Sequence, residues 1–226
     1  ASHLVLALDL ADRCLGTSFL EEPFFRNVPA FRIQTLAPGF RQPFAYGDAG
    51  GVGAYNDFLF RCVRQGGQRD LQAAVWAFHE QHWQARDDGT RGENPAFNFG
   101  WLGLLWFDPA LQGGTLDALP TSYRAADIGL AIVRDDWKAG GVAALLKCAP
   151  YGGHRLNDYR NANGFRYINV AHDDPDVNQF QIYARGAMVA CDDGYAYHKV
   201  TAAHNTILVN GKGQKGEGQH WTQPLR

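Results

Sequence analysis

The chain has 226 residues, a formal net charge of -2, 46% hydrophobic residues and 13% aromatic residues. This composition supplies enough apolar surface for a sizeable core in one large domain or two small ones. The near balance of charges, without a run of Lys and Arg, argues against nucleic acid as a partner. Since no apolar run approaches the roughly 18 to 20 residues that span a bilayer, we also expect no membrane segment.

The first half of the chain shows helical periodicity. Apolar residues recur every three or four positions over residues 4–15 and 71–82, which predicts two core-facing helices. A third helical run covers residues 97–107. Residues 23–53 are interrupted by Pro and Gly, so we predict a long irregular loop that shapes a binding surface. We therefore assign residues 1–113 to a helical domain.

The second half of the chain has the pattern of a β domain. Gly and Pro cluster where the periodicity changes, which predicts a linker over residues 114–122 and a β domain over residues 123–226. Short apolar runs separated by turn signals are typical of a sandwich or a large antiparallel sheet. Arg185-Gly186 and Asn210-Gly211 predict tight hairpin turns. The predicted strands are residues 128–134, 142–147, 165–171, 179–184, 187–191 and 206–210.

A polar run precedes the strand predicted at residues 179–184. Asp174, Asp176 and Asn178 are spaced two apart, so on an extended strand they would share one face with Phe180, and with His172 if the strand begins that early. This run concentrates groups that can bind a metal or move a proton.

Two further candidate ligands follow in the sequence. The predicted hairpin would return Asp192 to the neighbourhood of Asp174, and His204 opens the next apolar run. We therefore expect three candidate metal ligands on or beside adjacent strands.

Together these patterns resemble those of the heparinase II/III-like polysaccharide lyases, a group that acts on heparin, heparan sulfate or alginate. The resemblance implies an α+β multidomain fold, with the C-terminal part of an incomplete α/α toroid followed by a partial antiparallel β-sandwich. It also implies that the chain is an internal portion of a larger periplasmic or secreted enzyme. The matching motifs are Phe44-x-Tyr46-Gly47-Asp48, His172-x-Asp174-x-Asp176-x-Asn178-x-Phe180, Asp192-Asp193-Gly194-Tyr195 and His204-Asn205-Thr206-Ile207.

The resemblance also suggests roles for single residues. In that family the polar strand usually reads H-x-H-x-D-x-N-x-F, with the first His at the catalytic centre and the second at a zinc site. His172 takes the first position, as the base or as the group that neutralises the substrate carboxylate. Asp174 replaces the second His, while Asp192 and His204 take the positions of the other two zinc ligands. Because a carboxylate oxygen can replace an imidazole nitrogen at zinc, we expect a structural Zn²⁺ that braces the strand presenting His172.

The candidate substrate-binding residues are polar or aromatic groups suited to an anionic sugar. Arg can bind a carboxylate through two parallel hydrogen bonds, and the aromatic residues after the Asp-Asp-Gly turn could rim the same cleft. A solvated loop and an aromatic cluster at the edge of the sandwich are the alternatives for these segments. The candidates are His154, Arg155, Asn157, Tyr159, Arg160, Tyr195 and His198.

We therefore expect a polysaccharide lyase that cleaves an acidic, uronate-containing polysaccharide or oligosaccharide by β-elimination. Such a reaction needs a base for the C5 proton, a group that neutralises the carboxylate and an acid for the leaving oxygen. The family's catalytic Tyr lies on an upstream toroid helix, so activity is expected to need the remainder of the polypeptide. Two alternatives stay open. One is a non-catalytic carbohydrate-binding or structural module on the same scaffold, and the other is a glycoside hydrolase, which needs two facing carboxylates.

Overall fold

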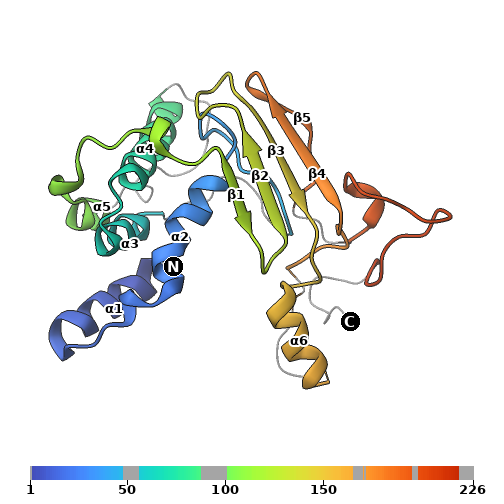
Figure 1. Ribbon diagram of the computed structural model, residues 1–226, viewed down its shortest axis with the longest axis horizontal. Coiled ribbons are helices and arrows are strands. Elements are labelled where there is room, and N and C mark those ends of the chain that lie inside the picture. Colours follow the sequence, from blue (N-terminus) through green and yellow to red (C-terminus); the bar gives the residue numbers. More distant parts are fainter. Residues whose placement is uncertain are drawn as a thin grey trace. The chain divides into compact units, whose positions relative to one another are not determined.

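The computed structural model describes residues 2–47, 56–87, 101–164, 170, 172–194 and 198–218, without the side chains of residues 82–87. The chain divides into two compact units (Figure 1). The helical unit comprises Ala1–Arg41 and Val52–Pro120, and the sheet unit comprises Gln42–Gly51 and Thr121–Arg226. The segment Gln42–Gly51 thus groups with the sheet, although it lies within the part of the sequence assigned to the helical domain.

The helical unit contains the helices expected from periodicity and two that were not expected, at Pro23–Gln34 and Phe58–Gly66. The prediction of an irregular loop over residues 23–53 is wrong for its first part, because a helix begins at Pro23, whose fixed φ suits the first helical position. None of the helices among the described residues is long and apolar enough to cross a membrane. The helices are α1 (Ser2–Leu15), α2 (Pro23–Gln34), α3 (Phe58–Gly66), α4 (Arg69–Asp87) and α5 (Trp101–Trp106), with short 3-10 turns at Phe19–Glu21, Pro109–Leu111 and Leu116–Ala118.

A buried carboxylate ties three helices of this unit together. Asp9 on α1 is 2% exposed and accepts a hydrogen bond of 2.6 Å from Arg61 Nε on α3. Arg13 Nε lies 3.1 Å from the same carboxylate, and the Trp106 indole on α5 donates to it at 3.3 Å. Burial alone would raise the pKa of Asp9, but these three donors outweigh burial and lower it.

The sheet unit is built on one antiparallel sheet in which every strand pairs with its neighbours in sequence. The strands predicted at residues 142–147 and 179–184 are confirmed at those bounds, and those predicted at 128–134 and 187–191 form over slightly shorter spans. The first strand begins at Ser122, within the predicted linker. The strands are β1 (Ser122–Ala125), β2 (Leu130–Arg134), β3 (Val142–Lys147), β4 (Gln179–Ala184) and β5 (Ala187–Ala190), in the order β1-β2-β3-β4-β5.

The two predicted tight turns have different surroundings. Arg185 and Gly186 have φ values of 52° and 91°, and they join β4 to β5 as the hairpin prediction requires. Asn210 and Gly211 also have positive φ, at 54° and 70°. Around them, however, only an isolated bridge between Val209 and Lys212 forms. The strand predicted at residues 206–210 is therefore wrong, since no described strand pairs with it, and all but residue 170 of the strand predicted at 165–171 lies outside the described residues.

The polar run before β4 does not form the extended strand face that its spacing predicts. Residues 172–178 form turns and bends, and Asn178 has a φ of 65°. This left-handed residue shifts the alternation by one position. Asp174 and Asp176 are buried before it, whereas β4 after it buries Gln179 and turns Phe180 outward. The carboxylates therefore lie on a compact loop rather than along one strand face.

The two faces of the sheet differ in how far their apolar side chains are buried. One face buries Leu130, Ile132, Leu145 and Tyr183, each 1% exposed or less. The opposite face carries apolar residues that remain exposed among the described residues. On this face, exposed apolar side chains of neighbouring strands lie side by side: Leu146 of β3, for example, pairs with Phe180 of β4. Such a face is typical of one sheet of a β-sandwich.

Candidate active site and metal centre

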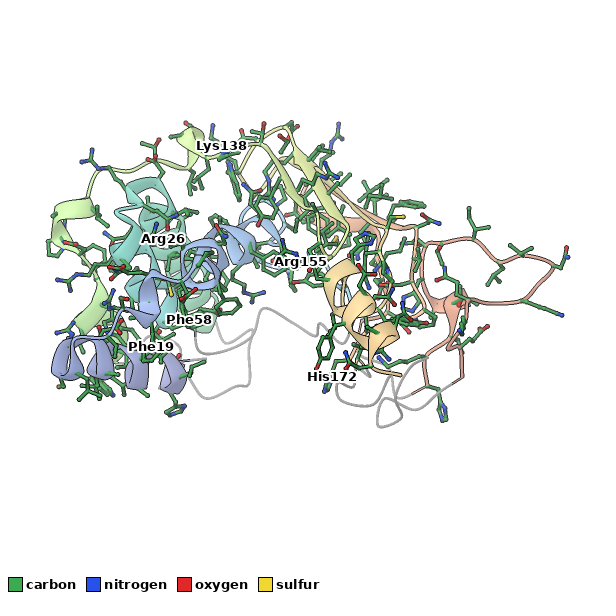
Figure 2. All side chains as sticks on the ribbon, turned by 60° about the horizontal axis from the view of Figure 1, so that its bottom comes forward. Phe19, Arg26, Phe58, Lys138, Arg155 and His172 are labelled. Atoms are coloured by element: carbon green, nitrogen blue, oxygen red, sulfur yellow. The ribbon has the colours of Figure 1, made fainter. Side chains whose placement is uncertain are left out.

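His172 is exposed and lines a pocket of about 250 Å³ in the sheet unit. Figure 2 labels this residue on the segment that precedes β4. Ile128, Leu130, Pro150 and Val170 give the pocket apolar walls, to which polar atoms are added by a few other residues. A concave, mostly apolar site with few polar groups is the usual form of a small-ligand pocket.

Tyr46 lines the same pocket, although sequence reasoning placed it in the helical half. Its segment is fixed to the sheet by Gln181 on β4, which accepts a hydrogen bond of 3.0 Å from the Ala45 amide and donates one to the Ala45 carbonyl. The next residue, Gly47, has a φ of 59°, and a Cβ there would lie 2.5 Å from the His172 carbonyl oxygen. Glycine is therefore required for this close approach, which sets Tyr46 beside the His172 loop.

A buried lysine fixes the His172 loop from the side of β3. Lys147 Nζ contacts the carboxylates of Asp173 and Asp176, the latter at 2.6 Å. The second oxygen of Asp173 accepts a hydrogen bond of 2.7 Å from the Gly152 amide. Burial alone would lower the pKa of Lys147, but the charges of Asp173 and Asp176 outweigh burial and raise it.

A second buried lysine fixes the same loop from the C-terminal side. Lys199 Nζ donates to Asp174 Oδ1 and to the Asp173 carbonyl, both at 2.7 Å. Asp174 Oδ2 accepts no hydrogen bond from any described residue although it is buried. Burial is the main reason that the pKa of Asp174 rises to about 6, and Lys199 only partly opposes it. Two lysines and three carboxylates thus hold the loop next to His172.

The structure brings two of the three predicted metal ligands into contact. His204 Nδ1 lies 2.6 Å from Asp192 Oδ2 and 3.9 Å from Asp193 Oδ1. Within the described residues, the group that could hold a metal ion comprises Asp192, Asp193 and His204, whose ligand atoms lie within 4.8 Å of one another. Burial alone would lower the pKa of His204, but the hydrogen bond and charge of Asp192 outweigh burial and raise it.

These donors fit a divalent cation in their chemistry. Asp192 and His204 offer a carboxylate oxygen and an imidazole nitrogen, both of which bind zinc. Asp174 does not join their contact group but pairs with Lys199 instead, and its buried second oxygen has no hydrogen-bond donor among the described residues. Asp193, adjacent to Asp192 in the motif, was missed as a candidate, and the neighbouring acid was the available signal.

The predicted substrate-binding residues separate into different environments. Most belong to a helix, α6 (His154–Ala162), where a solvated loop had been considered. His154, Arg155 (Figure 2) and Tyr159 are exposed on it. Asn157 and Arg160 instead line a second pocket of about 360 Å³. His198 is exposed, and Tyr195 lies outside the described residues.

The chain has a heparinase-like fold. A crystal structure of heparinase III matches it with a TM-score of 0.50 at 14% identity, covering 86% of this chain and 27% of that one. A heparinase III gene product with methylated lysines matches with a TM-score of 0.43 at 14% identity, covering 80% of this chain and 22% of that one. The chain therefore spans 22% to 27% of the length of these proteins.

This likeness concerns the fold alone, and it confirms the expected α+β class with part of an α/α toroid and part of an antiparallel β-sandwich. No family model matches the sequence. No curated protein matches it either.

Proposed function

We propose that the chain is part of a polysaccharide lyase that cleaves a uronate-containing polymer by β-elimination, with the reacting sugar bound at the His172 pocket. The observation that carries the proposal is the exposed imidazole of His172 in an apolar pocket, on a loop fixed by two buried lysines. Fixing a catalytic group before substrate binds is an effective use of such a network. A periplasmic or secreted location accompanies the proposal, since a long polysaccharide does not enter the cytoplasm.

The chemistry assigns a role to each polar group of the pocket. His172 takes the proton from C5 or, when protonated, neutralises the adjacent carboxylate. The electron pair of the C5–H bond forms the C4–C5 double bond, the bond from C4 to the glycosidic oxygen breaks, and that oxygen receives a proton. Tyr46 lines the same pocket and supplies a phenol for this proton transfer. The product carries an unsaturated uronate end.

A comparison of binding with turnover separates this proposal from a non-catalytic binding module. In the whole enzyme, His172→Ala should lower kcat by at least about a hundredfold while changing the affinity for the polymer much less, because general acid-base catalysis contributes about 10²- to 10⁴-fold. Tyr46→Phe should likewise act mainly on kcat. Equal loss of affinity and rate in both variants would support a binding role and contradict the proposed chemistry.

We also propose a structural Zn²⁺ held by the contact group of Asp192, Asp193 and His204, with Asp174 as a further ligand through its buried second oxygen. The contact of Asp192 with His204 and the buried Oδ2 of Asp174 support this assignment. When bound, the ion would brace the segments around His172 and would take no part in the reaction. Elemental analysis should find zinc in the wild-type protein and little in His204→Ala, and chelation should lower the melting temperature of the wild type alone. Equal zinc contents would refute the site.

A further inference from the structure

A second pocket in the sheet unit lies against one face of α6. Asn157, Arg160 and Asn161 line it, and their spacing of three and four residues places them on the same helical face. Tyr151 and Lys215 contribute from outside the helix. The pocket has a volume of about 360 Å³, and it is separate from the His172 pocket although Pro150 lines both.

The wall opposite α6 is fixed by hydrogen bonds before any ligand arrives. Gln214 accepts a hydrogen bond of 3.0 Å from the Val177 amide and donates one of 2.8 Å to the Val177 carbonyl. Its own backbone amide donates to Thr201 Oγ1 at 2.8 Å. The Tyr151 hydroxyl donates to the Lys215 carbonyl, so the backbone that carries the Lys215 side chain is also held. Little conformational entropy is therefore lost when this wall binds a ligand.

The groups that line this pocket suit an anion. Two are cations, Arg160 and Lys215, and no carboxylate is found among the described residues that line it. Burial raises the pKa of the Tyr151 hydroxyl, followed by the charges of four acids that are therefore close: Asp173, Asp176, Asp174 and Glu217. Lys147 pairs with Asp173 and Asp176, and Lys199 pairs with Asp174, so these lysines reduce the repulsion that three of the four acids exert on an anionic ligand.

We infer that this pocket is a second sugar subsite, which binds the carboxylate or sulfate group of an acidic sugar next to the one held at His172. Arg160 and Lys215 would bind the oxyanion, and Asn157 and Asn161 would hydrogen-bond the sugar hydroxyls. The apolar surfaces of Pro150 and Val177 would contact the ring. The inference rests on the proposed function only in taking an acidic polysaccharide as the substrate.

Binding of single sugars to charge-removal variants tests this subsite. Titrations use sodium glucuronate for the carboxylate, glucosamine 6-sulfate for the sulfate and glucose as the uncharged reference. Lys215→Ala should weaken binding of the preferred anionic sugar about tenfold, as expected for one charge-assisted contact. Asn157→Ala should weaken it by a smaller factor. Lys212→Ala is the matched control, since it removes the same charge from the same segment at a residue that does not line this pocket, and its affinity should equal that of the wild type.

Three results would overturn the inference: equal weakening by Lys215→Ala and Lys212→Ala, glucose binding as tightly as both anionic sugars, or no binding of either anionic sugar. Arg160→Gln is a less direct probe, because Arg160 is 1% exposed and its replacement can disturb the fold. The circular dichroism spectrum of this variant therefore has to match that of the wild type before its affinity is compared.

The binding result and the proposed lyase activity can fail separately. If the enzyme binds glucuronate through Lys215 but does not cleave uronate polymers, the subsite is supported and the proposed chemistry is contradicted. If the enzyme cleaves uronate polymers but its Lys215→Ala variant binds both anionic sugars with wild-type affinity, the proposed chemistry is supported and the subsite is contradicted.

Discussion

The two units bury carboxylates in opposite electrostatic surroundings. In the helical unit, Asp9 contacts two arginines and an indole N–H, and its pKa is lowered. In the sheet unit, burial raises the pKa values of Asp174 and Asp176 even though each contacts a lysine. Donors outnumber the single acid in the first case, whereas three neighbouring acids share two lysines in the second.

This difference separates a structural ion cluster from a candidate functional one. Groups with strongly shifted pKa values gather at functional sites, where burial and like charges are tolerated because they position reactive groups. The acids of the sheet unit lie on the loop that carries His172, whereas Asp9 joins helices of the helical unit. Under the proposed function, the cluster of the sheet unit positions His172 in addition to stabilising its loop, whereas the cluster around Asp9 joins helices.

Removing Lys199 should have the largest effect on this comparison. Lys199→Met leaves Asp174 buried without its cation and should lower the free energy of unfolding by about 3 to 5 kcal/mol. The double variant Lys199→Met with Asp174→Asn should recover at least about 1 kcal/mol of this loss, because no uncompensated charge remains. Urea denaturation of the four proteins measures the coupling. Additive losses would show that the pair does not interact as the structure indicates.

Removing Asp9 should have a somewhat smaller effect in the helical unit. Asp9→Ala leaves the guanidinium of Arg61 largely buried, with a side chain that is 11% exposed, and should cost about 3 kcal/mol in urea denaturation. The control Arg13→Ala removes a side chain that is 53% exposed and should cost less than about 1 kcal/mol. A loss from Arg13→Ala as large as that from Asp9→Ala would remove the distinction between the buried and the surface partner.

The stabilisation by Asp9 should depend on pH in a defined direction. Because the folded-state pKa of Asp9 lies below its ordinary value of 3.8, its contribution is present above pH 3.8 and is lost as the pH falls through the folded-state pKa. The stability difference between the wild type and Asp9→Asn should therefore be constant near neutral pH and shrink in acid. A difference that grows on acidification would contradict the assigned ion pairs.

Alanine at two left-handed glycines compares the units at a smaller scale. Gly67 in the helical unit has a φ of 62°, and a Cβ added there would meet no described atom within 4 Å, so Gly67→Ala should cost about 1 kcal/mol for the backbone alone. Gly47 has nearly the same φ, but its Cβ would meet the His172 carbonyl, and Gly47→Ala should cost about 2 kcal/mol. Thermal unfolding measures both. Equal costs would mean that the segment of Tyr46 does not approach His172 closely.

Local sequence signals predicted much of the sheet unit. The apolar runs of β3 and β4 and the Arg185-Gly186 turn were readable because each depends on neighbouring residues. The helix α6 was not expected, since its polar face carries no apolar periodicity. The loop before β4 was expected to be a strand because its polar residues are spaced two apart. The left-handed backbone conformation of Asn178 ends this pattern, and the sequence spacing gives no sign of it.

The sequence predicted several residues of the candidate site, but it predicted less well which residues contact one another there. Asp192 and His204 meet, as their motif suggested. The pairing of Asp174 with Lys199 could not be predicted. Lysine side chains are normally exposed, and nothing in the sequence indicates that Lys199 is fully buried. Tyr46 was missed for a similar reason. It lines the His172 pocket because Ala45 bonds to Gln181 on β4 and Gly47 approaches the His172 carbonyl, and these partners are remote in sequence.

The central claim, that the His172 pocket belongs to a uronate lyase, is tested most directly by ultraviolet absorbance of unsaturated uronate products. The whole enzyme is mixed with alginate, heparin or heparan sulfate, alongside its His172→Ala variant. We predict that absorbance grows with at least one of these polymers for the wild type and by less than about one hundredth of that rate for the variant. No growth with any uronate polymer, together with cleavage of neutral glycans, would contradict the account.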